Sequence, residues 1–390
     1  MGCKKKIVLV SALNYNFGSV LQSFAFQHIL NEKGIDAKII NYKKKISLMQ
    51  LLRITNLALV KVKLLNIRKK IYIFTNSDRK EWWRKKDINY KEFIELYINT
   101  TPVITGYKLL RKFITSYDVV IVGSDQLWNP MNNGTHFATV EFAPKNIVRY
   151  SYATSFGVTN LKKRDISLMK KVLPTFRMIS VREQQGAKII NSILGNLIDV
   201  HVDLDPTILI DGLKWENILN LDIKRKGEKY ILGYFISSNE KYRELIDSIA
   251  ESKGLHLIVL PHIDQYVRAD EKYEEYEVCS AGPIEFLNFI RNAEYVVTDS
   301  FHGTVFSILF KKRFCVLDRF ARNDLVSMNS RIDNLLSTVD LVERHANSIE
   351  DILDVLNKDI NFPRVYNLLQ VQREKSLKYI DSILTDIGEK

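Results

Sequence analysis

The sequence predicts an α/β protein built from two doubly wound, Rossmann-like domains. The chain has 390 residues, more than one hydrophobic core usually holds. Short runs rich in Val and Ile alternate with helical stretches, and this alternation starts afresh halfway along the chain. The runs are apolar throughout, which is typical of parallel strands covered on both faces. These three observations together favour two parallel sheets, each flanked by helices.

The first domain is expected over residues 1–203. Its predicted strands cover 7–12, 36–42, 118–125, 147–153, 178–183 and 198–203. Its predicted helices cover 20–34, 107–117, 162–173 and 183–194. Gly34 suits the C-terminal end of the first helix, because glycine readily adopts the left-handed conformation found there.

The second domain is expected over residues 204–345. Predicted strands cover 229–237, 255–261, 294–300 and 313–318, and predicted helices cover 242–252, 283–293, 304–312 and 332–337. Residues 346–390 are expected to add C-terminal helices that could pack back on the first domain.

The net charge of +12 is concentrated in a basic helical excursion at residues 43–91, which holds fifteen Lys and Arg against three acids. Its Leu and Trp residues would suit an anionic membrane surface. A solvated basic face is the alternative, and we favour it. The longest uncharged apolar stretch lies between Arg53 and Lys61, too short to span a bilayer. No basic stretch belongs to a nucleic-acid-reading motif, so nucleic acid is not an expected partner.

The three cysteines are odd in number and widely spaced, which argues against a disulfide framework and against a metal site. We expect a cytoplasmic protein, with peripheral contact at the inner face of the membrane left open.

Polar residues gather where predicted strands run into helices, the edge at which open parallel sheets bind ligands. The first such corner contains Asn16, Gly18 and Ser19. A turn in which Ser19 caps the helix is as good an interpretation as ligand contact. The second contains Asp125, Gln126 and Trp128, where Asp125 could position a sugar hydroxyl beside the Trp128 ring. The alternative has Asp125 capping a turn and Trp128 filling the core.

The third corner is TDSFHGT, with Ser300, His302, Gly303 and Thr304. Histidine suits proton transfer near neutral pH, glycine admits a ligand close to the backbone, and Thr304 could cap the following helix. Arg182 ends another predicted strand and could grip a carboxylate or phosphate, or form an ion pair with an acid such as Glu183.

At these residues the chain resembles the polysaccharide pyruvyl transferase family, which transfers pyruvyl from phosphoenolpyruvate to sugar hydroxyls as a ketal. The matching segments follow in order along most of the chain: NYNFGSVLQSFAFQHIL, VVIVGSDQLWNP, SYATSFG, ISVREQQGAKII, VDLDPTILI, ILGYFI, VVTDSFHGTVFSILF and NSRIDNLLSTVDL. The resemblance implies a fold like that of the GT-B glycosyltransferases. It also implies a role in surface polysaccharide biosynthesis, such as that of exopolysaccharide or capsule.

Carried onto this chain, the resemblance implies that His302 is the acid/base and that Arg182 anchors the donor. It turns the corner of Asn16, Gly18 and Ser19 towards the acceptor. From the residues of the other corners we further expect donor contacts at Ser300, Gly303 and Thr304, and acceptor contacts at Asp125, Gln126 and Trp128. Some relatives carry a basic residue where this chain has Ser300, so Arg331, Arg319 or Arg322 would share the donor's phosphate. No metal and no cofactor are expected beyond phosphoenolpyruvate as co-substrate. The expected partner is a saccharide acceptor, for which a lipid-linked form is left open.

Two other functions remain open on the sequence alone. A glycosyltransferase of the same two-domain build would use a nucleotide sugar instead of phosphoenolpyruvate. A non-catalytic module would bind glycan or membrane through the basic segment and consume no donor.

Overall fold

The first sheet contains four parallel strands in the order β2-β1-β5-β6. This computed structural model describes residues 5–13, 15–45, 67–68, 70–130, 137–195, 198–221, 229–262, 266–319 and 330–388. The strands are β1 (Ile7–Val10), β2 (Lys38–Ile39), β5 (Val119–Val122) and β6 (Val148–Ser151). Both β1 and β5 are fully buried, as their continuous apolar sequences predict.

Two strand pairs border this sheet. They are β3 (Tyr42–Lys43) with β4 (Ile104–Thr105), and β7 (Ile179–Val181) with β8 (Val200–Val202). Single parallel bridges join them to the sheet, from Ile39 to Thr100 on one side and from Tyr150 to Met178 on the other. The carboxyl ends of β5 and β7 therefore lie along one edge.

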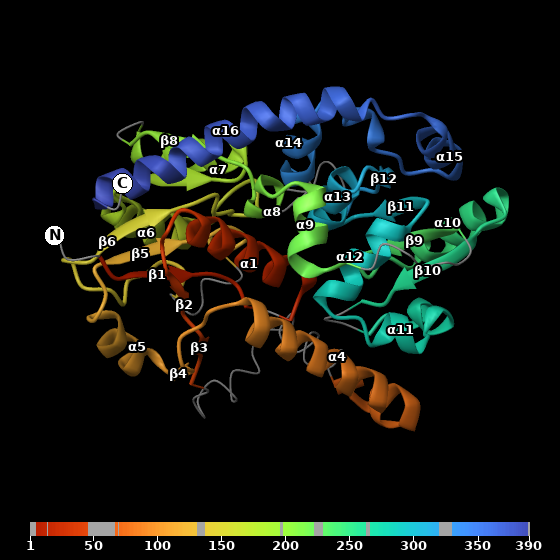
Figure 1. The fold of residues 1–390 in the computed structure, drawn as a ribbon, viewed down its shortest axis with the longest axis horizontal. Helices are drawn as coiled ribbons and strands as arrows, with labels where there is room; N and C mark the ends of the chain where they lie inside the picture. Colours follow the sequence, from red (N-terminus) through yellow and green to blue (C-terminus); the bar gives the residue numbers. More distant parts are fainter. Residues whose placement is uncertain are drawn as a thin grey trace.

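The second sheet has the order β10-β9-β11-β12, and all its pairs are parallel. Its strands are β9 (Tyr230–Tyr234), β10 (His256–Leu260), β11 (Tyr295–Thr298) and β12 (Arg313–Val316). The two sheets lie at opposite ends of the molecule, with helices between and around them (Figure 1). The expected α/β class with Rossmann-like parallel sheets is thus confirmed.

Helices cover both sheets. Around the first sheet they are α1 (Phe17–Glu32), α4 (Ser77–Tyr97), α5 (Tyr107–Ile114), α6 (Lys163–Val172), the 3-10 turn η2 (Leu173–Thr175), α7 (Gln184–Leu194), α8 (Pro206–Leu209) and α9 (Gly212–Leu219). Along the second half of the chain they are α10 (Glu240–Lys253), η3 (Arg268–Tyr273), α11 (Tyr276–Cys279), α12 (Pro283–Asn292), α13 (Phe301–Leu309), α14 (Ser330–Thr338), η4 (Val342–Arg344), α15 (Ile349–Asn357) and α16 (Phe362–Ile387).

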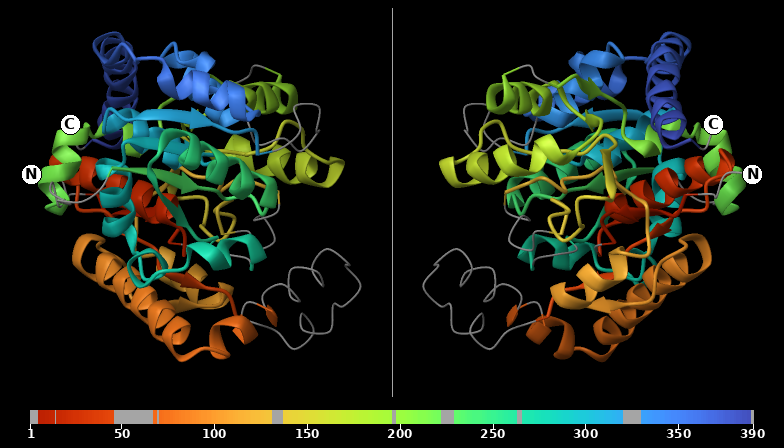
Figure 2. Two further views of the ribbon diagram at one scale, coloured as in Figure 1. Left: turned by 90° about the vertical axis from the view of Figure 1, so that its right-hand side faces the viewer. Right: turned by 90° about the vertical axis from the view of Figure 1, so that its left-hand side faces the viewer.

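The last helix, α16, runs from the second sheet back along the first (Figure 1). Tyr379 on this helix donates to the backbone oxygen of Ser151 at 3.0 Å, and the carboxylate of Asp386 accepts from Tyr150 at 2.6 Å. Helix α4 lies on the opposite side of the molecule from α16 in every view (Figure 2). The domain limits at residues 203 and 345 stay predictions.

One hydrophobic core joins the two halves. It contains residues of β1 and α1 together with residues of β9, β11, α12 and α13. At its centre the rings of Phe17 and Phe286 stack with centroids 4.6 Å apart. A shared apolar core of this kind holds the two sheets in one arrangement, because separating them would expose these rings to water.

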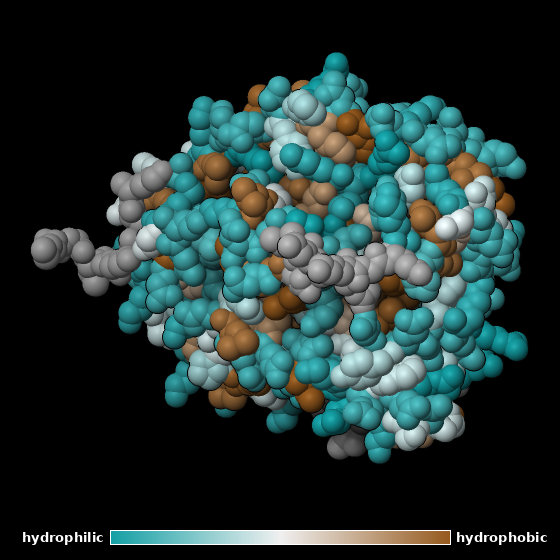
Figure 3. Space-filling view, turned by 45° about the vertical axis from the view of Figure 1, so that its right-hand side comes forward, coloured by the Kyte–Doolittle hydropathy of each residue, from teal (hydrophilic) through white to brown (hydrophobic). Residues whose placement is uncertain are grey.

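The outer surface is mainly hydrophilic on the face shown in Figure 3, with hydrophobic residues scattered over it. None of the described helices combines the length and the apolarity needed to cross a bilayer.

Candidate functional site

The first turns of α1 and α13 face each other where the two halves of the chain meet. A Cβ atom added at Gly18 would lie 2.0 Å from Nδ1 of His302. Only glycine leaves room for the imidazole here. Two of the corners singled out in the sequence are therefore brought into direct contact, although they are far apart along the chain.

Helix α13 begins at Phe301, three residues before the predicted start. Its N-cap is Ser300, whose hydroxyl accepts from the backbone N–H of Gly303 at 3.2 Å. The expectation that Thr304 caps this helix is wrong, because Thr304 lies inside it, fully buried, and donates to the backbone oxygen of Ser300. The earlier start places His302 in the first helical turn, where backbone N–H groups favour nearby anions.

Gly303 serves packing between helix and sheet. A Cβ at this position would approach Oγ1 of Thr298 to 2.6 Å and the ring of Tyr234 to 3.2 Å. The structure thus explains this glycine by the close approach of α13 to β9 and β11. It does not support the predicted donor contact at Gly303.

His302 has a buried side chain with one ring nitrogen unpaired. Its Nε2 atom has no hydrogen-bond partner among the described residues. The nearest acid is Asp205, whose Oδ2 lies 3.8 Å from Nε2. This distance is too long for a hydrogen bond, so the contact is electrostatic and the nitrogen stays available to a ligand.

Asp205 is the residue of this cluster that the sequence analysis missed. It caps α8 by accepting from the backbone N–H and the hydroxyl of Thr207. Its Oδ2 accepts from Nη1 of Arg182 at 2.7 Å and from the hydroxyl of Ser124 at 2.8 Å. Burial alone would raise the pKa of Asp205, but the nearby charges of His302 and Arg182 and the bond from Thr207 hold it well below its usual value. The sequence signal was Asp followed by Pro, which marks a helix start and carries no sign of a partner.

Arg182 is buried at the end of β7, with its side chain 2% exposed. The guanidinium stacks over the ring of Phe301, 4.4 Å from its centroid. Of the two alternatives left open, the ion pair exists, but with Asp205; Glu183 instead accepts from the hydroxyl of Ser155. Nε and Nη2 of Arg182 have no partner among the described residues, so the guanidinium can still bind an anion.

Arg331 on α14 is the second buried arginine of the cluster. Burial, reinforced by the nearby charge of Arg182, lowers the pKa of Arg331 to about 9. With its amide oxygen turned towards Arg331, Gln126 accepts from both terminal nitrogens at 2.8 Å. The Nε atom of Arg331 lacks a partner within the described ranges. Arg319 lies close enough for its charge to act on Arg331, whereas Arg322 lies outside the described residues.

The amino-terminal corner is assembled around Asp125. Asn16, and not Ser19, is the N-cap of α1, because its side chain accepts from the backbone N–H of Ser19. The Ser19 hydroxyl is thereby free to donate to Oδ2 of Asp125 at 2.6 Å. Asp125 has a φ of 76°, a left-handed conformation that costs a non-glycine residue energy. Strained polar residues at a strand end often mark functional sites, and this one lies beside the Gly18 corner.

Trp128 is a core residue. Its side chain is fully buried against Phe156 and Phe176, and its indole N–H donates to the backbone oxygen of Ala138. A ring enclosed in this way offers no face to a ligand. The structure therefore supports the core alternative for Trp128 and not the predicted acceptor contact.

The cluster as a whole offers several buried donors to a ligand, together with one buried acceptor, Oε2 of Glu183, that has no partner among the described residues. Arg182, Arg331 and His302 each present at least one nitrogen without a partner among the described residues, and Asp205 is occupied. No group of three or more His, Cys, Asp or Glu within the described ranges is arranged to hold a metal ion. Unpaired cationic donors in a buried place suit a small ligand with more than one negative charge.

Solved structures with the same fold include several epimerases. The chain superposes on a putative UDP-N-acetylglucosamine 2-epimerase from Listeria monocytogenes with a TM-score of 0.56 and 11% identity, over 100% of this chain and 99% of that one. The S. aureus MnaA-UDP complex gives 0.55 and 13%, over 99% and 98%. The UDP-GlcNAc 2-epimerase from Methanocaldococcus jannaschii gives 0.52 and 14%, over 97% and 99%. At such identities the likeness concerns the fold, a GT-B-like pair of Rossmann-like domains.

Sequence comparison is more specific. Among curated proteins no sequence matches the chain. The sequence profile of the polysaccharide pyruvyl transferases matches residues 16–319, which include Gly18, Arg182, Asp205 and His302. The match covers most of the chain and confirms the resemblance found in the sequence: the protein belongs to the polysaccharide pyruvyl transferase family.

Proposed function

We propose that this protein transfers the pyruvyl group of phosphoenolpyruvate to a pair of saccharide hydroxyls, forming a ketal for a bacterial-type surface polysaccharide. The observation that carries the proposal is the set of buried, unpaired donors on Arg182, Arg331 and His302. Family membership supports a transferase acting on a saccharide. Phosphoenolpyruvate is the donor that unites a carboxylate with a phosphate in one small molecule, which suits two arginines close together.

The two arginines would hold the donor. An arginine binds a carboxylate or phosphate through two parallel hydrogen bonds, and Arg182 keeps Nε and Nη2 for this purpose. Two buried cations repel each other, and an anion between them would relieve that repulsion and raise the lowered pKa of Arg331. Asp205 would keep Arg182 in place through Nη1.

His302 would supply the proton that starts the reaction. Protonation of C3 of the enol makes C2 electrophilic, and the first sugar hydroxyl adds there. The C2–O bond to phosphate then breaks, and the second hydroxyl closes the ketal at C2. One hydroxyl proton returns to His302 and the other leaves with inorganic phosphate, so the histidine ends in its starting state.

The acceptor would enter from the amino-terminal corner. Gly18 contacts the imidazole of His302, and the Ser19 hydroxyl beside it donates to Asp125, which would position a sugar hydroxyl. Asn16, which caps α1, and Gln126, which contacts Arg331, would complete the acceptor side. Ser300 would act on the donor only as the cap that orients the first turn of α13.

A lipid-linked acceptor would give the basic segment a purpose. Among its described residues, Arg68 and Lys70 are exposed beside the exposed Ile71 and Phe74; residues 46–66 and 69 lie outside the described ranges. We expect the protein to work in the cytoplasm and to sediment with anionic vesicles but not with neutral ones. If the same amount of protein sedimented with anionic and with neutral vesicles, the proposed binding of the basic segment to an anionic membrane would be wrong.

The deciding experiment measures inorganic phosphate released from phosphoenolpyruvate with a panel of saccharide acceptors. We expect acceptor-dependent release, reduced by about 100-fold or more in His302→Ala. Arg182→Lys should raise the KM for phosphoenolpyruvate, because lysine cannot form the paired hydrogen bonds. Arg177→Ala is the matched control, since Arg177 is 64% exposed and pairs with Asp386 on the surface. Release of a nucleoside diphosphate from a nucleotide sugar, with none of phosphate from phosphoenolpyruvate, would replace this proposal by a glycosyltransferase.

A further inference from the structure

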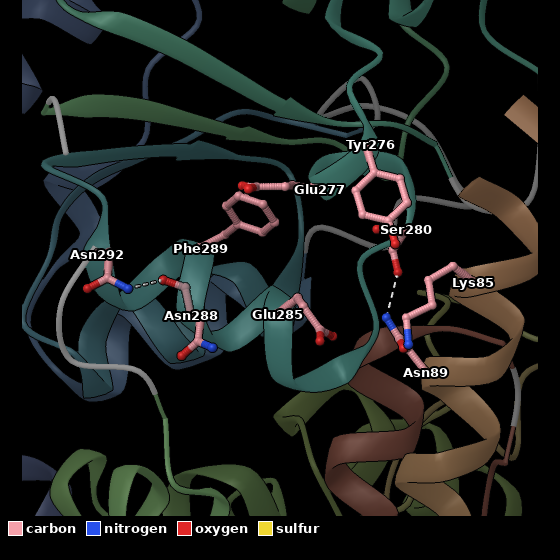
Figure 4. A pocket seen from close by; sticks show the side chains of 9 residues that line it. All are labelled: Lys85, Asn89, Tyr276, Glu277, Ser280, Glu285, Asn288, Phe289 and Asn292. Carbon is pink, nitrogen blue, oxygen red and sulfur yellow. Dashed lines mark hydrogen bonds between the residues drawn. The ribbon is translucent and has the colours of Figure 1, made fainter. Parts of the chain in front are cut away.

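A cavity lies away from the cluster around His302, between α4, α11 and α12 (Figure 4). Its volume is about 300 Å³, at the lower end of the range of ligand sites. Glu285, Asn288 and Asn292 line it from one face of α12. Another face of the same helix carries Phe286, whose ring stacks on Phe17 in the shared core. Helix α12 therefore separates this cavity from the cluster around His302.

The walls of the cavity are fixed to each other by contacts between distant parts of the chain. The amide of Asn89 on α4 donates to the backbone oxygen of Ser280 at 2.9 Å (Figure 4). A Cβ at Gly282 would lie 2.7 Å from Cβ of Asn89, so the two segments touch with no room to spare. A cavity with walls held in this way needs little reordering to accept a ligand.

The side chains around the cavity leave both donors and acceptors available. No described residue forms a hydrogen bond or ion pair with the ammonium group of Lys85 or with the hydroxyl of Tyr276. Asn89 uses its amide N–H₂ on Ser280, and nothing among the described residues donates to its oxygen. Glu285 accepts from the backbone N–H of Gly282 through one oxygen and keeps the other.

The charges disfavour an anionic ligand. Among the residues that line the cavity, Lys85 is accompanied by the carboxylates of Glu277 and Glu285, so the lining is not cationic. Tyr276, at the margin of the cavity, is 47% exposed, and Figure 4 shows its ring beside Ser280 and above Lys85 and Asn89. A pyranose has hydroxyls that both donate and accept, and a face of C–H groups that packs on an aromatic ring. Neutral saccharides match this combination, whereas phosphates and nucleotides do not.

We propose that this cavity binds a neutral saccharide unit, with Tyr276 as the ring against which the sugar packs and Lys85, Asn89 and Glu285 as its hydrogen-bonding partners. The site is separate from the cluster that would hold the pyruvyl donor, and it does not depend on the identity of that donor. A glycan bound here would be retained at a distance from His302.

The test is binding of the full-length protein to an array of neutral and anionic oligosaccharides without any phosphoenolpyruvate, followed by saturation-transfer NMR with the neutral glycans retained. We expect binding of neutral hexose or N-acetylhexosamine glycans, weakened by roughly tenfold or more in Tyr276→Ala. Leu213→Ala is the control, because Leu213 is 67% exposed on α9 and lies outside the cavity; it should bind as the wild type does.

Two results would overturn the proposal. One is the absence of any neutral glycan bound by the wild type. The other is unchanged binding in Tyr276→Ala together with unchanged binding in Lys85→Ala, both shown by urea denaturation to be folded. Phosphate release from phosphoenolpyruvate is measured separately, so a failure there leaves the glycan result intact, and the reverse holds too.

Discussion

At the scale of single residues, the cluster around His302 depends on one carboxylate that touches several partners. Asp205 is fully buried and binds Arg182, Ser124 and Thr207 at once. A buried charge lowers the stability of the fold unless it is paired. Removing one partner of a buried ion pair destabilises a protein more than replacing both partners by apolar residues. Asp205 is thus a positioning residue, and its loss should be visible in stability as well as in activity.

We predict that Asp205→Asn lowers the free energy of unfolding by about 3–5 kcal/mol near pH 7, because Arg182 would stay buried without its counter-charge. The folded-state pKa of Asp205 is depressed, so its contribution is present above the unfolded value of about 3.9 and is lost as the pH falls below it. Urea denaturation at several pH values should show the gap between wild type and variant closing below about pH 4.

Asp211→Asn is the matched control for Asp205. Asp211 is an exposed N-cap, and asparagine caps a helix equally well, so this variant should lose much less stability than Asp205→Asn. A gap between wild type and Asp205→Asn that stays constant down to pH 3 would show that the charge of Asp205 does not stabilise the fold.

Gly18 offers a second test at this scale. In Gly18→Ala the new methyl group would press against the imidazole of His302, at a helical position where alanine is otherwise favoured over glycine. We predict roughly tenfold or greater loss of kcat for phosphate release, because a displaced catalytic group loses much of its effect.

The control for Gly18 is a double variant. If Gly18→Ala acts through His302, it should add little to the loss in His302→Ala, and the two effects should be strongly non-additive. Additive losses would place the effect of Gly18 elsewhere, for example on acceptor binding.

At the scale of elements, the caps of two helices decide where functional side chains point. Helix α13 starts at Phe301 because the Ser300 hydroxyl satisfies the N–H of Gly303, and this start turns His302 towards α1. Helix α1 starts at Phe17 because the side-chain oxygen of Asn16 accepts a hydrogen bond from the backbone N–H of Ser19. In both cases the cap lies earlier than the sequence pattern indicated, and the residues expected to cap lie inside the helix.

We predict that Ser300→Ala costs about 1 kcal/mol of folding stability, the usual effect of losing an N-cap, and also raises the KM for phosphoenolpyruvate. Asn239→Ala is the matched control, because Asn239 caps α10 away from the cluster; it should cost a similar amount of stability without changing KM. An unchanged KM for phosphoenolpyruvate in Ser300→Ala would show that the Ser300 cap does not contribute to donor binding. Stability is read from urea denaturation and KM from phosphate release.

At the scale of the whole molecule, a shared core and the returning helix α16 join the two sheets. Leu384 of α16 is fully buried in the same core that contains Phe17 and Phe286. Tyr379 and Asp386 add polar contacts with β6 and its end. The cluster around His302 contains side chains from both halves of the chain. Its geometry therefore depends on the contacts of the shared core and of α16 that hold the halves together.

We predict that Leu384→Ala lowers the free energy of unfolding by about 2–5 kcal/mol while the molecule still unfolds in a single transition. Val371→Ala on the same helix, where Val371 is 63% exposed, should change it by less than about 0.5 kcal/mol. Two separate calorimetric transitions in Leu384→Ala would show that the halves unfold independently and that α16 does not join them.

The sequence by itself determined the fold class, the alternation of strands and helices, and the strand-end corners that hold His302, Arg182, Asp125 and Gly18. Hydrophobic periodicity and the geometry of parallel sheets are local properties, and they carry this information along the chain. The tertiary structure alone decided which residues meet. Asp205 pairs with Arg182 across 23 positions, the Gly18 backbone faces His302, and Trp128 is enclosed by Phe156 and Phe176. Such contacts depend on how separate elements pack, and no local pattern records the partner that a buried side chain will find.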